Sequence, residues 1–138
     1  MMFEESLLID RIQTITGYTT EYSKEFSIDD APLGGNSTTI YVGHLGIKPV
    51  NSDKEEMISS GYAAHESQKL LMTGIHIVCS RSDFVTVYND VVDAYKDWSP
   101  IGDPNVSALI LVEGSVLAAT NKRIHYREIV GTIFPRVY

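Results

Sequence analysis

The side chains best suited to chemistry in this sequence are four histidines and one cysteine: His44, His65, His76, His125 and Cys79. No two of the histidines stand at the spacing of a metal-binding pair, and a lone cysteine brings no second thiolate. His76 and Cys79 lie in an apolar strand pattern, which predicts a hydrogen-bonded core histidine and a buried, unactivated thiol. His125 stands between two arginines and is expected on a solvated or interface face. The sequence therefore predicts no metal centre.

Patterns that support catalysis are also missing. The chain contains no Gly-x-Ser-x-Gly elbow and no Cys/His signature. The glycine pair at residues 34–35 is not followed by Lys-Ser or Lys-Thr, so it predicts no phosphate-binding loop. Asp90, Asp93 and Asp97 line one side of a predicted helix, where a row of carboxylates is typical of a solvated face. We expect no enzyme and no cofactor. A small enzyme is the weaker alternative, and it would need a pocket of perturbed titratable groups, for instance around His76.

Length and composition are those of one globular domain. The chain has 138 residues, of which 43% are hydrophobic and 21% charged, enough for a core within a single domain spanning residues 1–138. No apolar run is long enough to span a bilayer, and the first ten residues are acidic where a signal peptide is basic. We therefore expect an intracellular protein with no membrane partner.

The net charge of −7 is unevenly distributed along the chain. Residues 1–69 carry 11 acidic and 5 basic side chains, a net charge of −6, whereas residues 70–138 carry 7 and 6, a net charge of −1. An acidic chain is a poor nucleic-acid binder, because affinity for phosphates depends on clustered lysine and arginine. The asymmetry suits contact between different parts of two copies, and equally suits solvated faces alone.

One helix predicted within residues 82–100 organises the second half of the chain. Aromatic and apolar residues recur there at spacings of three and four, which places them on one helical stripe. Such a stripe needs an apolar surface, and the runs at residues 70–79 and 106–112 have the length of strands. We expect the stripe, including the single tryptophan, to form the core. Its members are Phe84, Tyr88, Val91, Tyr95 and Trp98.

The remaining pattern predicts one N-terminal helix and several strands. The helix spans residues 3–16 and is followed by a short edge strand at 19–26, and strands are also expected at 39–49 and 64–79. Residues 27–38 and 51–61 are expected to be loops. The end of the chain predicts a three-stranded antiparallel meander: 106–112, a tight turn at 113–115, 116–120, a turn at 121–122, and 123–135. The fold class is therefore α+β, a mixed, mostly antiparallel sheet of about 4–6 strands with an N-terminal helix and one central helix packed on it.

The order of these elements resembles a family of viral assembly proteins. It is carried by IYVGHLGIKP at residues 40–49, by the helix that closes in Trp98-Ser99-Pro100, by the hairpin at residues 108–129, and by an aromatic residue in the last strand, Tyr126. This order is similar to that of the tail terminator proteins of long-tailed bacteriophages, particularly those with contractile tails. The resemblance covers nearly the whole chain.

This resemblance implies a structural protein of the virion tail, assembled in the host cytoplasm. Such subunits form a hexameric ring at the head-proximal end of the tail tube, stop its polymerisation and present a surface for joining to the head. The implied partners are further copies of the chain, the tail tube protein, the neck or connector proteins and, as a further candidate, the sheath protein. Genomic DNA would pass through the ring without specific binding. A neck or head-completion protein, or a tail tube subunit, is the alternative of the same structural class.

A closed ring needs two different patches on each subunit, since one patch of a subunit meets another patch of the next. The acidic first half and the basic last hairpin suit this geometry. We therefore expect a set of basic residues to face acidic residues of the adjacent subunit. The basic candidates are Lys122, Arg123 and Arg127, and their acidic partners are Asp29, Asp30, Glu55 and Glu56.

Overall fold

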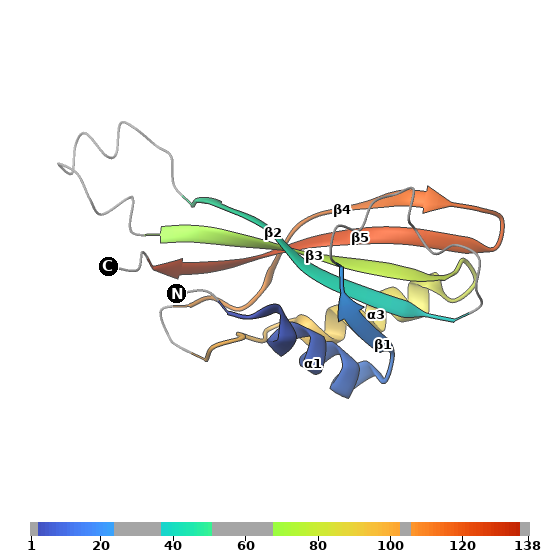
Figure 1. Cartoon of the computed structure of the whole chain (residues 1–138), viewed down its shortest axis with the longest axis horizontal. Helices are drawn as coiled ribbons and strands as arrows, with labels where there is room; N and C mark the ends of the chain where they lie inside the picture. The colour runs from blue at the N-terminus through green and yellow to red at the C-terminus, as the bar shows by residue number, and fades with distance from the viewer. Residues whose placement is uncertain (1–2, 24–36, 51–67, 103–105, 136–138) are drawn as a thin grey trace.

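The computed structural model describes residues 3–23, 37–50, 68–102 and 106–135, and the structural statements below concern these residues. A five-stranded sheet carries two helices on one of its faces (Figure 1). The strand order is β1-β2-β3-β5-β4; β1 pairs parallel with β2, and every other pair is antiparallel. The predicted α+β class is confirmed. The elements are α1 (Glu5–Thr16), β1 (Thr19–Tyr22), β2 (Thr39–Pro49), β3 (Gln68–Ser80), α3 (Phe84–Tyr95), β4 (Ile110–Ala119) and β5 (Arg123–Pro135).

Strand β3 lies at the centre of the sheet, as its sequence predicts. Apolar residues occupy both of its faces in the second half, so that Ile75 and Ile77 face the helices while Val78 faces the opposite side, and all three are fully buried. Cys79 is buried as expected, and burial raises the pKa of its thiol to about 11. The predicted start of this strand at residues 64–67 lies outside the described residues.

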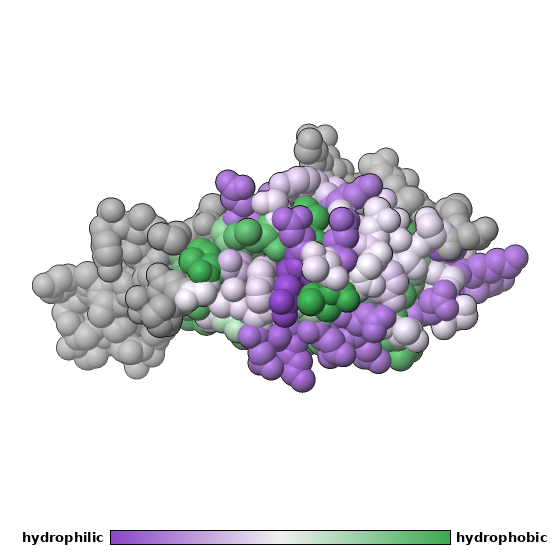
Figure 2. Space-filling model, turned by 90° about the horizontal axis from the view of Figure 1, so that it is seen from below, coloured by the Kyte–Doolittle hydropathy of each residue, from purple (hydrophilic) through white to green (hydrophobic). Residues whose placement is uncertain are grey.

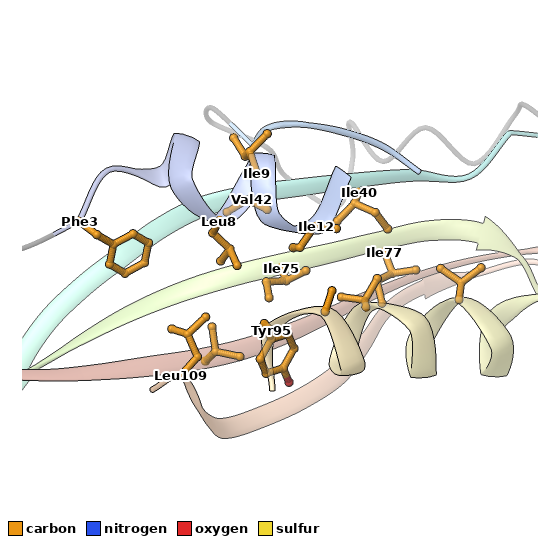
Figure 3. Close-up of a cluster of buried hydrophobic side chains, with 14 of the residues drawn as sticks. Phe3, Leu8, Ile9, Ile12, Ile40, Val42, Ile75, Ile77, Tyr95 and Leu109 are labelled. Carbon is orange, nitrogen blue, oxygen red and sulfur yellow. The ribbon is translucent and has the colours of Figure 1, made fainter. Parts of the chain in front are cut away.

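Helix α1 packs on the β1–β2 side of the sheet through Leu8 and Ile12, which are fully buried (Figure 3). It ends at Gly17, whose φ of 78° places it in the left-handed conformation that glycine adopts without strain. The backbone N–H of His44 in β2 donates to the Glu5 carboxylate at 2.9 Å, which ties the start of the helix to the sheet. Leu7 and Ile15 of the same helix are exposed. Figure 3 shows Leu8 and Ile12 pointing toward the sheet residues Ile40, Ile75 and Ile77.

Helix α3 corrects the prediction for Trp98. The helix ends at Tyr95, and Asp97 has a φ of 58°, so the helical spacing no longer applies to the tryptophan. The Trp98 ring is half-buried at the border of the core, and the Arg11 guanidinium lies 5.6 Å from the centre of the ring. Phe84 and Tyr88 are also half-buried. The buried face of the helix consists of Val87, Val91, Ala94 and Tyr95.

Strand β4 corrects the predicted meander. The turn expected at residues 113–115 is wrong: these residues continue one ten-residue strand, and bulges lie at Leu111/Glu113 and at Val116/Ala118. Within this strand, position 114 requires glycine, because the Tyr126 hydroxyl of β5 occupies the space that a side chain at 114 would fill. The meander is therefore a two-stranded hairpin of β4 and β5.

Candidate subunit interface

The two edges of the sheet are built differently, and the β4 edge is the more open. Every residue from Ile110 to Val116 is exposed, including Leu111 at 58% and Val116 at 54%. An edge strand presents unpaired backbone N–H and C=O groups, and an apolar one readily accepts another strand. The other edge, β1, has only four residues. The β4 edge is therefore the principal candidate for contact with another chain.

The helices leave β4 uncovered. Helix α1 packs against β1 and β2, and α3 packs against β3 and α1. In Figure 1 both helices lie below β2 and β3, whereas β4 lies above β5, at the top of the view. Seen from the helix side, the surface is largely hydrophilic and carries separate hydrophobic patches (Figure 2). Strand β4 contributes four exposed large apolar side chains: Ile110, Leu111, Val112 and Val116.

Next to this edge, a buried carboxylate is held by three tyrosines. Glu128 of β5 is 1% exposed. Its carboxylate accepts hydrogen bonds from the hydroxyls of Tyr95 at 2.6 Å, Tyr88 at 3.4 Å, and Tyr126. Burial, together with these bonds and the carboxylate charge, raises the pKa of Tyr88, Tyr95 and Tyr126, so all three phenols stay protonated donors at neutral pH. The cluster positions α3 against β5.

The aromatic rings of this cluster also contact one another. The rings of Phe84, Tyr88 and Tyr126 lie with their centres 5.3–5.9 Å apart, in tilted or edge-to-face pairs. All three rings are half-buried. The sequence analysis did not identify Glu128. A signal was present, since Glu128 alternates with Ile124, Tyr126 and Val130 on the helix side of β5.

The opposite, back face of the sheet carries a buried histidine pair. His76 Nδ1 lies 3.0 Å from His125 Nε2, and the two side chains are 5% and 0% exposed. The prediction for His76 is confirmed, whereas the solvated position expected for His125 is wrong. Burial, with the nearby Arg127 charge, lowers the pKa of both rings, that of His76 to about 4. Both histidines are therefore neutral at pH 7.

The structure separates the three basic interface candidates. Lys122 is exposed in the turn before β5. Arg123 is 6% exposed, and its Nη2 donates to the carbonyl oxygen of Ser37 at 2.8 Å, so it is not a surface charge of the chain as described. Arg127 is half-buried beside the histidine pair. The acidic candidates Asp29, Asp30, Glu55 and Glu56 lie outside the described residues.

Other classes of site gain no support from the geometry. In the described part of the chain, no group of three or more His, Cys, Asp or Glu side chains is placed to hold a metal ion. None of the described helices is long and apolar enough to cross a bilayer. A scan against models of known protein families gave no match, and a search among curated proteins found no significant relative.

Proposed function

We propose that this protein is a structural subunit of a phage tail, forming a ring that caps the head-proximal end of the tail tube. In this role the ring ends polymerisation of the tube and provides the surface that joins the tail to the neck or connector. The observation that carries the proposal is the exposed, apolar edge strand β4. Proteins commonly blunt such an edge with charge, proline or a covering element. An open apolar edge suits a chain whose working state is an assembly.

The ring requires a second patch that differs from the first. The short edge β1 lies at the other end of the strand order, so the sheet offers two unlike edges on opposite sides of one subunit. Such a pair of patches supports cyclic assembly, in which each interface is heterologous. The number of six subunits in the ring and its position at the head-proximal end of the tail come from the resemblance in element order. The partners we propose are further copies, the tube protein, and the neck or connector proteins, with the sheath protein as a further contact.

Electron microscopy of the purified protein, alone and mixed with tail tubes, tests this proposal. We expect closed rings of uniform size alone, and a ring at one end of each tube in the mixture. Tubes that polymerise in the presence of the protein should be shorter than tubes grown without it.

Two outcomes would contradict the proposal. Open filaments formed by the protein alone would identify a tube subunit, because a non-closing heterologous contact continues indefinitely. Failure to bind tube ends, combined with binding to isolated connectors, would identify a neck protein.

A further inference from the structure

We infer that adjoining copies join by antiparallel pairing of β4 of one copy with β1 of the next, fastened by an ion pair between Glu21 and Arg127. This inference rests on the proposed ring and adds its interface. The occupant of the open β4 edge is then a second copy of this chain.

Strand directions fit this pairing. Strand β1 runs parallel to β2, while β3, β5 and β4 each run antiparallel to the strand before them in the sheet. Therefore β1 and β4 run in opposite directions. A rotation about an axis parallel to the strands preserves their directions, so β4 of one copy meets β1 of the next antiparallel. Pairing of β4 with β4 would instead close a two-fold dimer and leave no apolar edge to continue a ring.

The two strands also lie at the same level of the sheet. The registers connect Thr20 to Val116 and Glu21 to Ser115 through rows of directly opposed residues. If the next copy continues the sheet without stagger, Glu21 stands beside Ser115, and the exposed Tyr22 stands beside Gly114, which has no side chain. Helix α1 of the next copy would then lie beside α3 of the first copy, over strand β4, which the helices of a single copy do not cover.

The charges near the two edges favour the same pairing of β4 with β1. Arg127 has a buried Nε with no hydrogen-bond partner among the described residues, and its charge lies close enough to His76 and His125 to lower the pKa of both rings. The back-face row through Arg127 consists of Glu21, Tyr41, His76, Arg127 and Ser115.

Glu21 is the acidic member of that row, and it is exposed at the opposite edge. Neighbouring strands lie about 4.8 Å apart, so within one copy Glu21 and Arg127 are roughly 14 Å apart between Cα atoms. Across the inferred interface they are roughly 10 Å apart, with only the small Ser115 between them. Extended glutamate and arginine side chains cover that distance, and pairing the half-buried guanidinium stabilises the joined state.

Cysteine cross-linking tests the pairing directly. In the double variant Glu21→Cys with Ser115→Cys, both positions are exposed. Within one chain they stand four strand spacings apart, roughly 19 Å, which is beyond the reach of a disulfide. We expect oxidation to give a ladder of covalent oligomers up to the size of the ring. The matched control is Asp10→Cys with Ser115→Cys, because Asp10 is exposed on the outer side of α1, and it should give no ladder.

Charge reversal tests the ion pair. Glu21→Arg and Arg127→Glu should each raise the concentration needed for assembly about tenfold or more, because like charges then face each other. An equal mixture of the two variants should restore assembly, since copies of the two variants in alternation place opposite charges at every interface. Asp10→Arg makes the same charge change away from the edge and should assemble normally. Circular dichroism confirms folding of each variant.

Three outcomes are distinguishable. A ladder with rescue in the mixture supports the inferred interface. Intact rings of the cysteine variant without a ladder would overturn it while leaving the proposed ring in place. A wild-type chain that stays monomeric alone and on tubes would overturn the proposed function itself.

Discussion

The two edges of the sheet differ in length and in how far the helices cover them. At one edge, β1 is short and packed beneath α1, and the Tyr18 hydroxyl just before it donates to Asp90 of α3 at 2.6 Å. At the other edge, β4 is ten residues long, apolar and exposed. A chain that needed to stay monomeric would protect both edges. The β4 edge therefore has the length, apolar character and exposure that the inferred strand pairing requires.

The interior differs between the two sides as well. Under the β1 edge the core is apolar, with Leu8, Ile12 and Val42 fully buried. Near the β4 edge, the buried Glu128 and its tyrosines take the place of apolar packing. A charged group with several hydrogen-bond donors requires one geometry, whereas apolar side chains tolerate several. The exposed strand β4 therefore lies next to a core region in which the hydrogen bonds of Glu128 require one geometry.

Removal of the buried carboxylate should have the largest effect on folding. Glu128→Ala should lower the free energy of unfolding by about 3–5 kcal/mol, because it opens a cavity and leaves the buried Tyr95 hydroxyl and two half-buried phenols without their acceptor. Val42→Ala, at the same level on the β1 side, removes only methyl groups and should cost less. Urea denaturation measures both. An equal loss in the two variants would contradict the contrast between the two interiors.

Acid should weaken the fold through His76, which lies on the back face between the two edges. Its pKa is lowered from 6.5 to about 4 by burial, with His125 and Arg127 adding to the effect. The unfolded chain binds the proton near pH 6.5 and the folded chain only near pH 4. This contribution is therefore complete above pH 6.5 and is lost as the pH falls toward 4, by roughly 3 kcal/mol at most.

Thermal melts across this pH range measure the loss, and NMR titration of the His76 ring gives the midpoint directly. Tyr41 of β2 lies directly opposite His76 in the sheet and is therefore a further neighbour of the ring. A His76 midpoint near 6.5 in the folded protein would show that the ring is not buried as neutral imidazole.

Two glycine substitutions compare the edges at the level of single atoms. An alanine Cβ at Gly114 would collide with the Tyr126 hydroxyl and lie 2.8 Å from its ring carbon Cζ, within a cluster that cannot easily move. We expect Gly114→Ala to cost about 1–3 kcal/mol. At Gly43 in β2, next to β1, the colliding atom is the Ser23 hydroxyl, which can rotate away. Gly43→Ala should therefore cost clearly less in the same denaturation assay.

Lysine on the open edge should affect folding least and assembly most. Leu111→Lys with Val116→Lys alters exposed side chains, so the free energy of unfolding should change by no more than about 0.5 kcal/mol per site. Ring formation should nevertheless be lost, because charge on an edge opposes strand addition. Val85→Lys on α3, at a side chain that is 68% exposed, is the matched control and should assemble normally. Analytical ultracentrifugation distinguishes these outcomes, and undiminished rings in the double variant would exclude the β4 edge.

The sequence by itself determined those features that depend on local periodicity. Apolar residues on both faces of residues 70–79 predicted a central strand, since only a strand covered on both sides buries both sets. The same periodicity located α3 and two residues of its buried face, Val91 and Tyr95. It also identified His76 as a core residue, because its neighbours in the strand are apolar.

The tertiary structure decided the features that depend on strands far apart in the chain. Glu113-Gly114-Ser115 has the composition of a turn, yet it continues β4, because pairing with β5 supplies backbone partners and Tyr126 fills the space above Gly114. His125 is flanked by arginines in sequence, but its register with Val78 on the central strand places it in the interior. Glu128 is tolerated there only because three tyrosines, two of them from α3, converge on it. Local pattern carries no information about such convergence, since the hydrogen-bond donors that stabilise the charge are brought together by folding alone.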